Sequence, residues 1–175
     1  MKIRKTVLIV NGKPRAGKDT FVEILNDFIP TYKYSMIEKV KSMALDCGYK
    51  ASKDEKDRKF LYELKKLTDE YSDMSMRDVK DRVWEFAAHN IKELIMVIDA
   101  RDPKDIEHLA YVTGGYTVFI DNEKVPAITS NKADANVDDY EYDFYIKNNG
   151  TLEDFEENIY DFFIALIKLI EVPEQ

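Results

Sequence analysis

Cysteine and histidine are scarce in this sequence, and their scarcity excludes several kinds of site. The 175 residues include one cysteine, Cys47, and two histidines, His89 and His108. A single thiol excludes an intrachain disulfide and a cysteine-rich metal cluster. The two histidines do not have the spacing of a pair of metal ligands, so we interpret each as a structural or surface residue. Any chemistry must therefore depend on other side chains.

Basic residues and long apolar runs are also limited. Lysine and arginine number 26 against 34 aspartate and glutamate residues, which gives a net charge of −8 and a pI near 4.9. Because a general nucleic-acid binder needs a basic face, we expect no nucleic-acid partner, although one local basic pocket can still bind a small anion. The longest apolar runs are too short to cross a bilayer and no signal peptide precedes the first strand. We therefore predict a cytoplasmic protein without a membrane partner.

The sequence does contain apolar strands that alternate with helical patterns. We expect strands at about 5–11, 32–36, 94–98, 116–120 and 143–147, and helices at about 17–29, 35–47, 54–71, 76–90, 102–114 and 151–170. Continuous apolar strands in this alternation predict an α/β fold with a parallel sheet covered on both faces. With 45% hydrophobic residues and no linker, residues 1–175 are expected to form a single domain.

Some of these helices also have caps or apolar stripes. Ser35 and Glu38 have the spacing of a capping box, and Thr151 is expected to cap the last helix. Apolar spacing predicts two buried helix faces, made by Phe21, Ile24, Leu25 and Phe28 and by Leu152, Phe155, Ile159, Phe162, Leu166 and Ile170. It also predicts a strongly amphipathic helix over 54–71, with an apolar stripe of Phe60, Leu64, Leu67 and Tyr71.

The segment NGKPRAGKDT, residues 11–20, lies between the first strand and the first helix. Gly12, four residues, and then Gly17-Lys18 form the G-x-x-x-x-G-K pattern of a phosphate-binding loop. The glycines let backbone N–H groups converge on phosphates at a helix N-terminus, and the lysine can reach the outer phosphates. Asp19 stands where serine or threonine usually supports magnesium, and Thr20 comes one position later. The alternative interpretation is a glycine turn with solvated lysines.

A second motif is the apolar strand 94–98, which ends at Asp99. A carboxylate at the end of such a strand can hold magnesium in nucleotide-binding proteins. Ligands of parallel α/β sheets bind at the carboxyl ends of strands, where both motifs are expected. Arg101 follows two residues later, and its planar fork could bind a second phosphate. The alternative for Arg101 is a salt bridge to Asp102 or Asp105.

Three segments resemble one known family. GKPRAGKDTFVEIL (12–25) resembles the phosphate loop of the P-loop nucleoside monophosphate kinases, above all the GKDT variant of phage deoxynucleoside monophosphate kinases, and is also similar to adenylate kinases. VIDARDPKDIEHL (97–109) and DFYIKNNGTLEDFEENI (143–159) look like later segments of these kinases. The resemblance implies a three-layer P-loop kinase fold with a five-stranded parallel sheet. It also implies a helical acceptor-binding insert at about 31–90 and a lid at about 121–141.

The same resemblance implies roles for individual residues in an ATP- and Mg²⁺-dependent kinase. Asn148 and Gly150 would border the adenine. Lys41 and Arg58 would join Arg101 in binding the acceptor, with a solvated surface charge as the alternative for Arg58. Lys18, Asp99 and Arg101 would be catalytic, and Asp99 and Thr20 would hold the metal. ATP would bind to Gly12, Lys13, Arg15, Ala16, Gly17, Lys18, Asp19 and Thr20.

We therefore predict transfer of the γ-phosphoryl group of ATP to a small phosphorylated acceptor, above all a nucleoside or deoxynucleoside monophosphate. Tyr49, Phe60 and Tyr62 could stack on its base. Dephospho-coenzyme A and phosphomevalonate are alternative acceptors. Lids of this family usually supply arginines, whereas residues 121–141 contain only Lys124 and Lys132. The loop residue Arg15 could supply that charge. A nucleotide-binding regulatory protein and an NTPase are the rival hypotheses, and the oligomeric state is left open.

Overall fold

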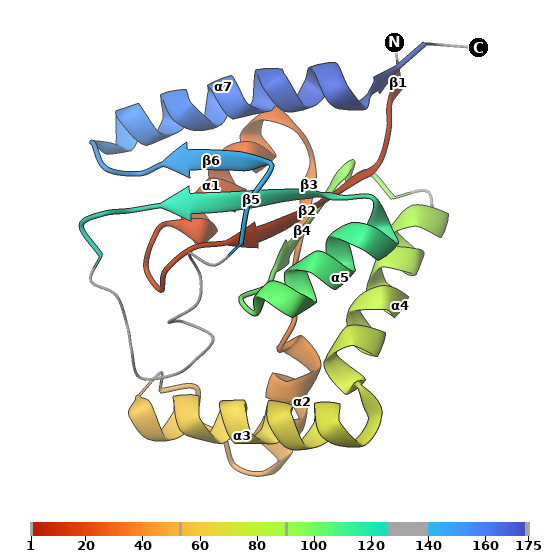
Figure 1. Cartoon of the computed structure of the whole chain (residues 1–175), viewed down its shortest axis with the longest axis vertical. Coiled ribbons are helices and arrows are strands. Elements are labelled where there is room, and N and C mark those ends of the chain that lie inside the picture. The colour runs from red at the N-terminus through yellow and green to blue at the C-terminus, as the bar shows by residue number, and fades with distance from the viewer. Residues whose placement is uncertain (1, 53, 90, 126–139, 174–175) are drawn as a thin grey trace. The chain divides into compact units, whose positions relative to one another are not determined.

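A computed structural model of the chain describes residues 2–52, 54–89, 91–125 and 140–173. The chain divides into two compact units (Figure 1). The first unit consists of Met1–Lys33 and His89–Gln175, and the second unit consists of Tyr34–Ala88. Each unit is described separately below. No helix among the described residues is long and apolar enough to cross a membrane.

A five-stranded parallel sheet is the centre of the fold, with the strand order β3-β4-β2-β5-β6. The central strand β2 is buried at every position because neighbouring strands and helices cover it. Register pairs Val10 with Asp99 and Asn11 with Phe119, so the carboxyl ends of β2, β4 and β5 lie side by side. The strands are β2 (Thr6–Asn11), β3 (Thr31–Ser35), β4 (Ile95–Asp99), β5 (Tyr116–Asp121) and β6 (Phe144–Lys147).

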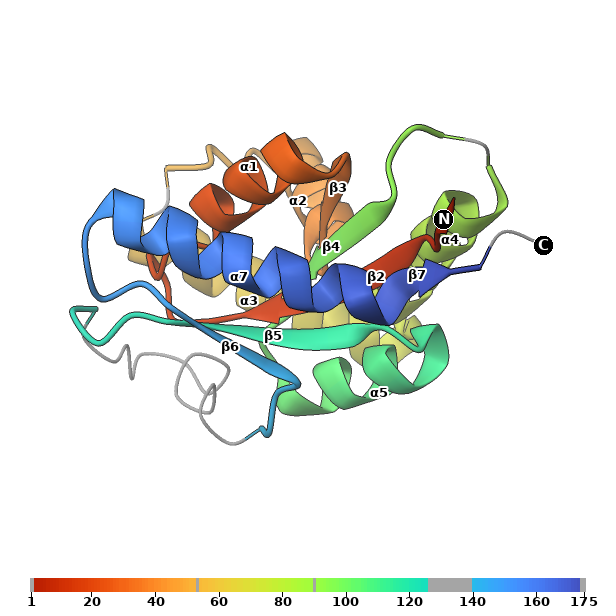
Figure 2. The same ribbon diagram turned by 90° about the horizontal axis from the view of Figure 1, so that it is seen from above.

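Helices of the first unit cover both faces of the sheet, which makes three layers (Figure 2). Helices α1 (Lys18–Phe28) and α7 (Leu152–Ile170) pack together on one face, and α5 (Pro103–Thr113) lies on the other. Alternate strand residues point to opposite faces, so apolar runs are needed to fill both layers. The core between the sheet and α1/α7 contains Leu8, Val10, Phe21, Leu25, Ile95, Val97, Val118, Ile120, Ile146, Phe155, Ile159, Phe162, Leu166 and Ile170.

Two residues of the expected buried stripes are exposed. Phe28 is 39% exposed, with its ring stacked on Phe163, and Leu152 is 56% exposed. Phe28 is the last residue of α1 and Leu152 is the first residue of α7. Periodicity predicts which face of a helix is apolar, but it does not say how far the covering surface extends at the helix ends. The interior members of both stripes are buried or partly buried, as predicted.

Two helices of the first unit, α5 and α7, begin at the capping residues that the sequence predicts. Thr151 and Asp154 form a complete capping box at the start of α7, and this hydrogen bonding to Thr151 lowers the pKa of Asp154. Asp102 caps α5 by accepting from the Lys104 N–H group at 2.9 Å, with Pro103 in the first turn. A second, two-stranded sheet was not predicted. In it, β1 (Lys2–Ile3) pairs antiparallel with β7 (Glu171–Val172), and strands of two residues are too short to give a sequence pattern.

The second unit is helical, with α2 (Glu38–Asp46), α3 (Glu55–Ser72) and α4 (Met74–Ala88). The capping box expected from Ser35 and Glu38 does not form. The helix begins at Glu38, with Ile37 at the cap position, so Ser35 lies too early in the chain to cap it. Asp54 instead caps α3 by accepting from the Asp57 N–H group at 2.8 Å. Asp73, with φ of 51°, separates α3 from α4.

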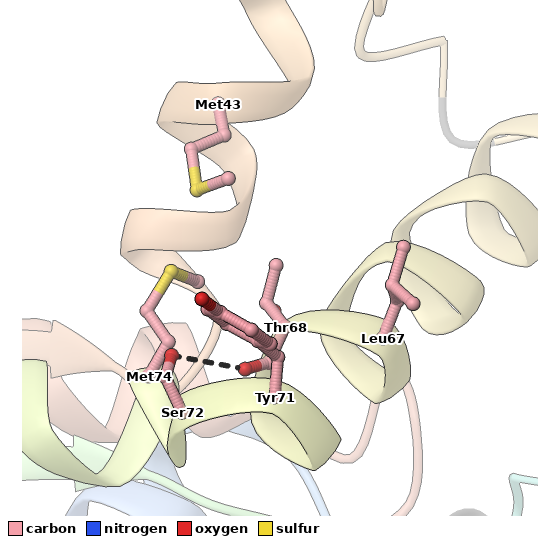
Figure 3. A pocket seen from close by; sticks show the side chains of 6 residues that line it. All are labelled: Met43, Leu67, Thr68, Tyr71, Ser72 and Met74. Carbon is pink, nitrogen blue, oxygen red and sulfur yellow. Dashed lines mark hydrogen bonds between the residues drawn. The ribbon is translucent and has the colours of Figure 1, made fainter.

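The apolar stripe expected on α3 is not buried. No residue of α3 is buried, and Leu67 and Tyr71 are 65% and 91% exposed. The core of this unit comes instead from α2 and α4, which bury Val40, Ala44, Met76, Val79 and Phe86. The exposed end of α3 borders an open apolar depression of about 430 Å³ (Figure 3), lined by Met43, Leu67, Thr68, Tyr71, Ser72 and Met74.

Candidate active site

The phosphate-binding pattern forms a tight loop between β2 and α1 that requires both of its glycines. Gly12 and Gly17 have φ angles of 150° and 104°, which side chains rarely permit. A Cβ atom on Gly12 would lie 2.6 Å from the Ile120 carbonyl oxygen, and one on Gly17 would lie 2.4 Å from Asn148 Nδ2. A side chain at position 12 would therefore meet the backbone of β5, and one at position 17 would displace the Asn148 side chain.

Lys18 lies at the first position of α1, directly after this loop. Its Nζ donates to the carbonyl oxygens of Gly12 and Lys13, at 2.6 and 3.1 Å. The ammonium group is thus held over the loop, beside the N-terminus of α1. Unpaired N–H groups and the positive end of the helix dipole attract an anion to the same place. The arrangement can bind phosphate oxygens.

The other loop residues differ in exposure and strain. Ala16 is fully buried, Lys13 is half-buried and Arg15 is exposed. Arg15 has φ of 69°, and such a conformation for a residue other than glycine costs on the order of 1 kcal/mol or more. Strain of this kind is typical of functional loops. Because Arg15 is exposed, its guanidinium group is accessible to a ligand.

Asp19 and Thr20 occupy the first turn of α1. The Asp19 carboxylate is 85% exposed and pairs with the Lys33 ammonium group on β3. Its charge is therefore compensated by lysine. Thr20 is half-buried, one residue after the position at which a hydroxyl usually supports the metal. Its contact with magnesium stays a prediction.

Asp99 ends β4 beside the loop, in register with Val10. Within the described ranges, its Oδ1 is buried and has no hydrogen-bond partner. A buried carboxylate oxygen without a partner is costly unless a cation or a donor satisfies it. The described residues contain no group of three or more His, Cys, Asp or Glu side chains placed to hold a metal ion. One carboxylate completed by substrate phosphates is the usual way of binding Mg²⁺, and Asp99 fits that role.

Arg101 is half-buried two residues after Asp99. Its carbonyl oxygen accepts from Asn11 Nδ2 at 3.4 Å, which places residue 101 next to the strand that enters the loop. The Asp102 carboxylate accepts the capping hydrogen bond of α5, and a salt bridge of Arg101 to Asp102 or Asp105 stays the alternative interpretation. The structure therefore brings the loop, Asp99 and Arg101 together at one edge of the sheet.

Asn148 contacts the phosphate loop through its side chain, which sequence reasoning missed. Its Nδ2 donates to the Ala16 carbonyl oxygen at 2.8 Å, and its N–H group donates to the Asp121 carbonyl oxygen at 2.7 Å. Only a backbone contact with adenine was expected there. The signal in the sequence is a polar residue directly after the β6 strand, at the same sheet edge as the loop.

The expected acceptor residues Lys41 and Arg58 belong to the second unit. Lys41 lies on α2 and pairs with Glu38 at 3.4 Å, and Arg58 is exposed in the first turn of α3. Phe60 and Tyr49 are partly exposed, and Tyr62 is 43% exposed. Most of the expected lid, including Lys132, lies outside the described residues. Lys124 is described, and its Nζ donates to the Gly150 carbonyl oxygen at 3.3 Å.

Fold and loop together define a class, the P-loop kinase fold, and comparisons with solved structures agree. The chain is similar to dephospho-CoA kinase from Campylobacter jejuni, with a TM-score of 0.55, 18% identity and 93% and 97% of the two chains covered. It is similar to shikimate kinase from Aquifex aeolicus, with a TM-score of 0.52, 14% identity and coverage of 92% and 96%. It is also similar to thymidylate kinase from Candida albicans, with a TM-score of 0.52, 9% identity and coverage of 100% and 97%.

Sequence comparisons add nothing to this result, since no protein-family model and no curated protein matches the chain. At identities below 20%, the structural likeness concerns the fold. The predicted three-layer fold with its five-stranded parallel sheet is confirmed.

Proposed function

We propose that the protein transfers the γ-phosphoryl group of ATP to a small phosphorylated acceptor, most specifically a nucleoside or deoxynucleoside monophosphate. One observation supports the proposal above all others. A phosphate-binding loop that ends in Lys18 lies beside a strand whose final carboxylate, Asp99, has a buried oxygen without a partner. Arg101 follows at the same sheet edge. Phosphoryl transfer is mainly positioning and charge neutralisation, so these groups are sufficient in kind.

Each group has a distinct role in this proposal. The loop from Gly12 to Thr20, with Lys13, Arg15, Ala16, Gly17 and Asp19, binds the phosphates of ATP, and Lys18 stabilises charge on the transferring group. Asp99, assisted by Thr20, holds Mg²⁺, which neutralises the β- and γ-phosphate oxygens when bound. Arg101 binds the acceptor phosphate through its fork of donors. Arg15 supplies the cationic charge that a lid arginine would otherwise provide.

The acceptor is inferred from charge. The three similar kinases bear the names of three different acceptors, so the fold leaves the acceptor open. A monophosphate needs several cations near the transferring group, and Arg101, Lys41 and Arg58 are the candidates. We propose that the second unit is the acceptor-binding part of one kinase domain in a cytoplasmic enzyme. Dephospho-coenzyme A and phosphomevalonate have a similar cation requirement and are the alternative acceptors.

An ATP-consumption panel tests the proposal. It contains the ribo- and deoxyribonucleoside monophosphates, dephospho-coenzyme A, phosphomevalonate and an acceptor-free control, each with and without Mg²⁺. We expect one nucleotide to be converted, with its diphosphate identified by mass spectrometry. If only dephospho-coenzyme A or phosphomevalonate is converted, the assignment of a nucleoside monophosphate as the acceptor is refuted. If no compound of the panel is converted, the proposed kinase activity is refuted.

A regulatory nucleotide-binding protein is the second candidate, favoured by the absence of arginine from residues 121–141. Such a protein would bind ATP in calorimetry and turn over nothing. ATP hydrolysis that does not depend on any acceptor would favour an NTPase instead. The three candidates therefore predict different results in the same two assays.

A further inference from the structure

A buried asparagine, Asn11, joins the phosphate loop to two other segments of the first unit. It is the last residue of β2 and is fully buried. Its Oδ1 accepts from the Gly12 N–H group at 2.8 Å. Its Nδ2 donates to the Tyr142 hydroxyl group at 2.7 Å and to the Arg101 carbonyl oxygen at 3.4 Å. One amide thus contacts the first glycine of the loop, the backbone of Arg101 and Tyr142.

These contacts allow only one orientation of the Asn11 amide. The reversed amide would direct its NH₂ group at the Gly12 N–H group and its oxygen at the Arg101 carbonyl oxygen, so donor would face donor and acceptor would face acceptor. A buried polar group that loses its partners is destabilising, so the Gly12 N–H group and the Arg101 carbonyl oxygen fix the orientation. The Tyr142 hydroxyl group, which can donate or accept, adds a third hydrogen bond to the same amide. Movement of one partner therefore changes the geometry of the other two.

Packing holds the Tyr142 hydroxyl group in place. Tyr142 is 5% exposed, and its ring centroid lies 5.0 Å from that of Phe119, the register partner of Asn11. Its ring also lies 5.8 Å from the ring of Tyr145, whose hydroxyl group accepts from the Tyr142 N–H group at 3.1 Å. The aromatic cluster of Phe119, Tyr142 and Tyr145 thus presents a fixed acceptor to Asn11.

We propose that Asn11 and Tyr142 are positioning residues that set the phosphate loop relative to the strand end bearing Arg101. This inference rests on the proposed function, in which the loop holds the donor phosphates and Arg101 holds the acceptor phosphate. In-line transfer requires both phosphates at a defined separation, and a displacement of about 1 Å can slow such a reaction about a hundredfold. Neither residue contacts the reacting atoms in this scheme, because both act through the backbone of Gly12 and Arg101.

Kinetics of matched tyrosine variants test the proposal. Tyr142→Phe removes the hydroxyl group that Asn11 contacts and keeps the ring. Tyr160→Phe removes the hydroxyl group of a 48% exposed side chain on α7 and keeps a ring that packs on Phe28 and Phe163. We expect kcat to fall about tenfold in Tyr142→Phe, with KM for ATP within about threefold of wild type. In Tyr160→Phe both constants should stay within about twofold. Equal losses in the two variants would overturn the proposal.

A double-mutant cycle tests whether the two residues act as one unit. Asn11→Ala is expected to lower kcat about a hundredfold, and adding Tyr142→Phe to it should cause little further loss. Thr6→Val is the control for stability, because it removes a buried hydroxyl group that donates to the Arg4 carbonyl oxygen at the other end of β2 from the loop. It should lower the Tm by about 2–6 °C, as Tyr142→Phe does, and leave kcat unchanged. Independent losses at Asn11 and Tyr142, or a loss of kcat in Thr6→Val, would show a general effect of instability.

A measurement without turnover separates this inference from the proposed function. Selective ¹⁵N-glycine labelling gives a spectrum of six glycine amides, in which the Gly12 resonance reports its hydrogen bond to Asn11. Tyr142→Phe should shift the Gly12 resonance and leave Gly48 in place, and Tyr160→Phe should shift neither. An unmoved Gly12 resonance would overturn the positioning role even in an active enzyme. If the wild-type protein phosphorylates nothing, the proposed function fails, and the Gly12 shift still decides whether Asn11 and Tyr142 hold the loop.

Discussion

The phosphate loop of the first unit and helix α3 of the second unit differ in how their residues are held. The loop is flanked by fully buried Asn11 and contains fully buried Ala16, and two of its glycines have no room for a side chain. Helix α3 buries no residue, and its last turns expose Leu67 and Tyr71. Tight packing makes substitution costly, whereas exposed positions tolerate change. Substitutions in the loop should therefore be costly, whereas the charges on α3 can change without loss of the fold.

This comparison agrees with the division of labour in the proposed kinase. The groups proposed to bind ATP and metal are placed by β2, β4 and their connections, whose geometry is set by the sheet. The groups proposed to choose the acceptor, Lys41 and Arg58, lie on helices α2 and α3 of the second unit. Under this proposal, acceptor preference can change with little cost to stability.

Removal of the Lys18 ammonium group should have the largest effect on activity. Lys18→Ala is expected to lower phosphoryl transfer by about a hundredfold to a thousandfold, because charge stabilisation in the transition state is lost. The Lys18 ammonium group donates to the carbonyl oxygens of Gly12 and Lys13. Alanine is a strong helix former at this first position of α1, so we expect the circular dichroism spectrum to be unchanged. The matched control is Lys168→Ala, at the exposed end of α7. Activity of Lys18→Ala within a few-fold of the control would refute the phosphate-loop assignment.

Substitutions at Asp99 and Arg101 should have different effects, the first on the use of Mg²⁺ and the second on the use of the acceptor. A charge-assisted contact of this kind contributes about 1.5–3 kcal/mol, so each variant should lose about tenfold to a hundredfold in kcat/KM. Asp99→Asn should weaken the magnesium-dependent steps, so that more Mg²⁺ is needed for half-maximal activity. Arg101→Ala should raise KM for the acceptor more than KM for ATP. Asp99→Asn also removes a buried charge whose Oδ1 has no partner among the described residues, so its Tm without Mg²⁺ should not fall. Loss of ATP affinity alone in both variants would contradict this division.

Local sequence patterns were sufficient for the sheet, the phosphate loop and most helices. Apolar runs of five or six residues predicted the buried strands, and the glycine spacing predicted a loop whose φ angles require glycine. Thr151 and Asp102 predicted helix starts because capping acts between residues two or three positions apart. These features are set by short-range sterics and hydrogen bonds, which a sequence contains directly.

Contacts across the chain could not be predicted in the same way. Asn11 and Tyr142 are separated by 131 positions, and Asn148 and Ala16 by 132. Their pairing depends on strand order and register, which no local pattern specifies. The exposure of the apolar stripe on α3 could not be predicted for a related reason, because such a stripe shows which face could be covered and not whether another element covers it. The helix itself was predicted to within one residue.

Gly17 in the phosphate loop and Gly48 in the second unit both have positive φ, so the same substitution at each compares how tightly the two regions are packed. A Cβ atom on Gly17 would lie 2.4 Å from Asn148 Nδ2 and 3.3 Å from the buried Phe155 ring, whereas one on Gly48 would meet nothing within 4 Å. Gly48→Ala should cost only backbone strain, about 1 kcal/mol, and Gly17→Ala should cost at least about 2 kcal/mol more. Thermal unfolding of the two variants measures this difference. Equal falls in Tm would mean that the loop can relax around a side chain.

The smallest expected effect is a pH dependence confined to the second unit. Tyr34 is 9% exposed and donates to Asp78 Oδ2 at 2.5 Å, and burial raises the pKa of its hydroxyl group to about 12, with the Asp78 hydrogen bond adding to the shift. Unfolded tyrosine ionises near pH 10. The stability that comes from this raised pKa is therefore complete below about pH 10 and is lost as pH rises toward about 12. Over that range the free energy of unfolding should fall by about 2 kcal/mol more in wild type than in Tyr34→Phe.

Denaturant unfolding at pH 9, 10, 11 and 12 provides the measurement of this pH dependence. The control is Tyr62→Phe, at an exposed tyrosine of the same unit, and it is expected to follow wild type. Parallel curves for wild type and Tyr34→Phe would show that Tyr34 is not held in this buried, bonded state.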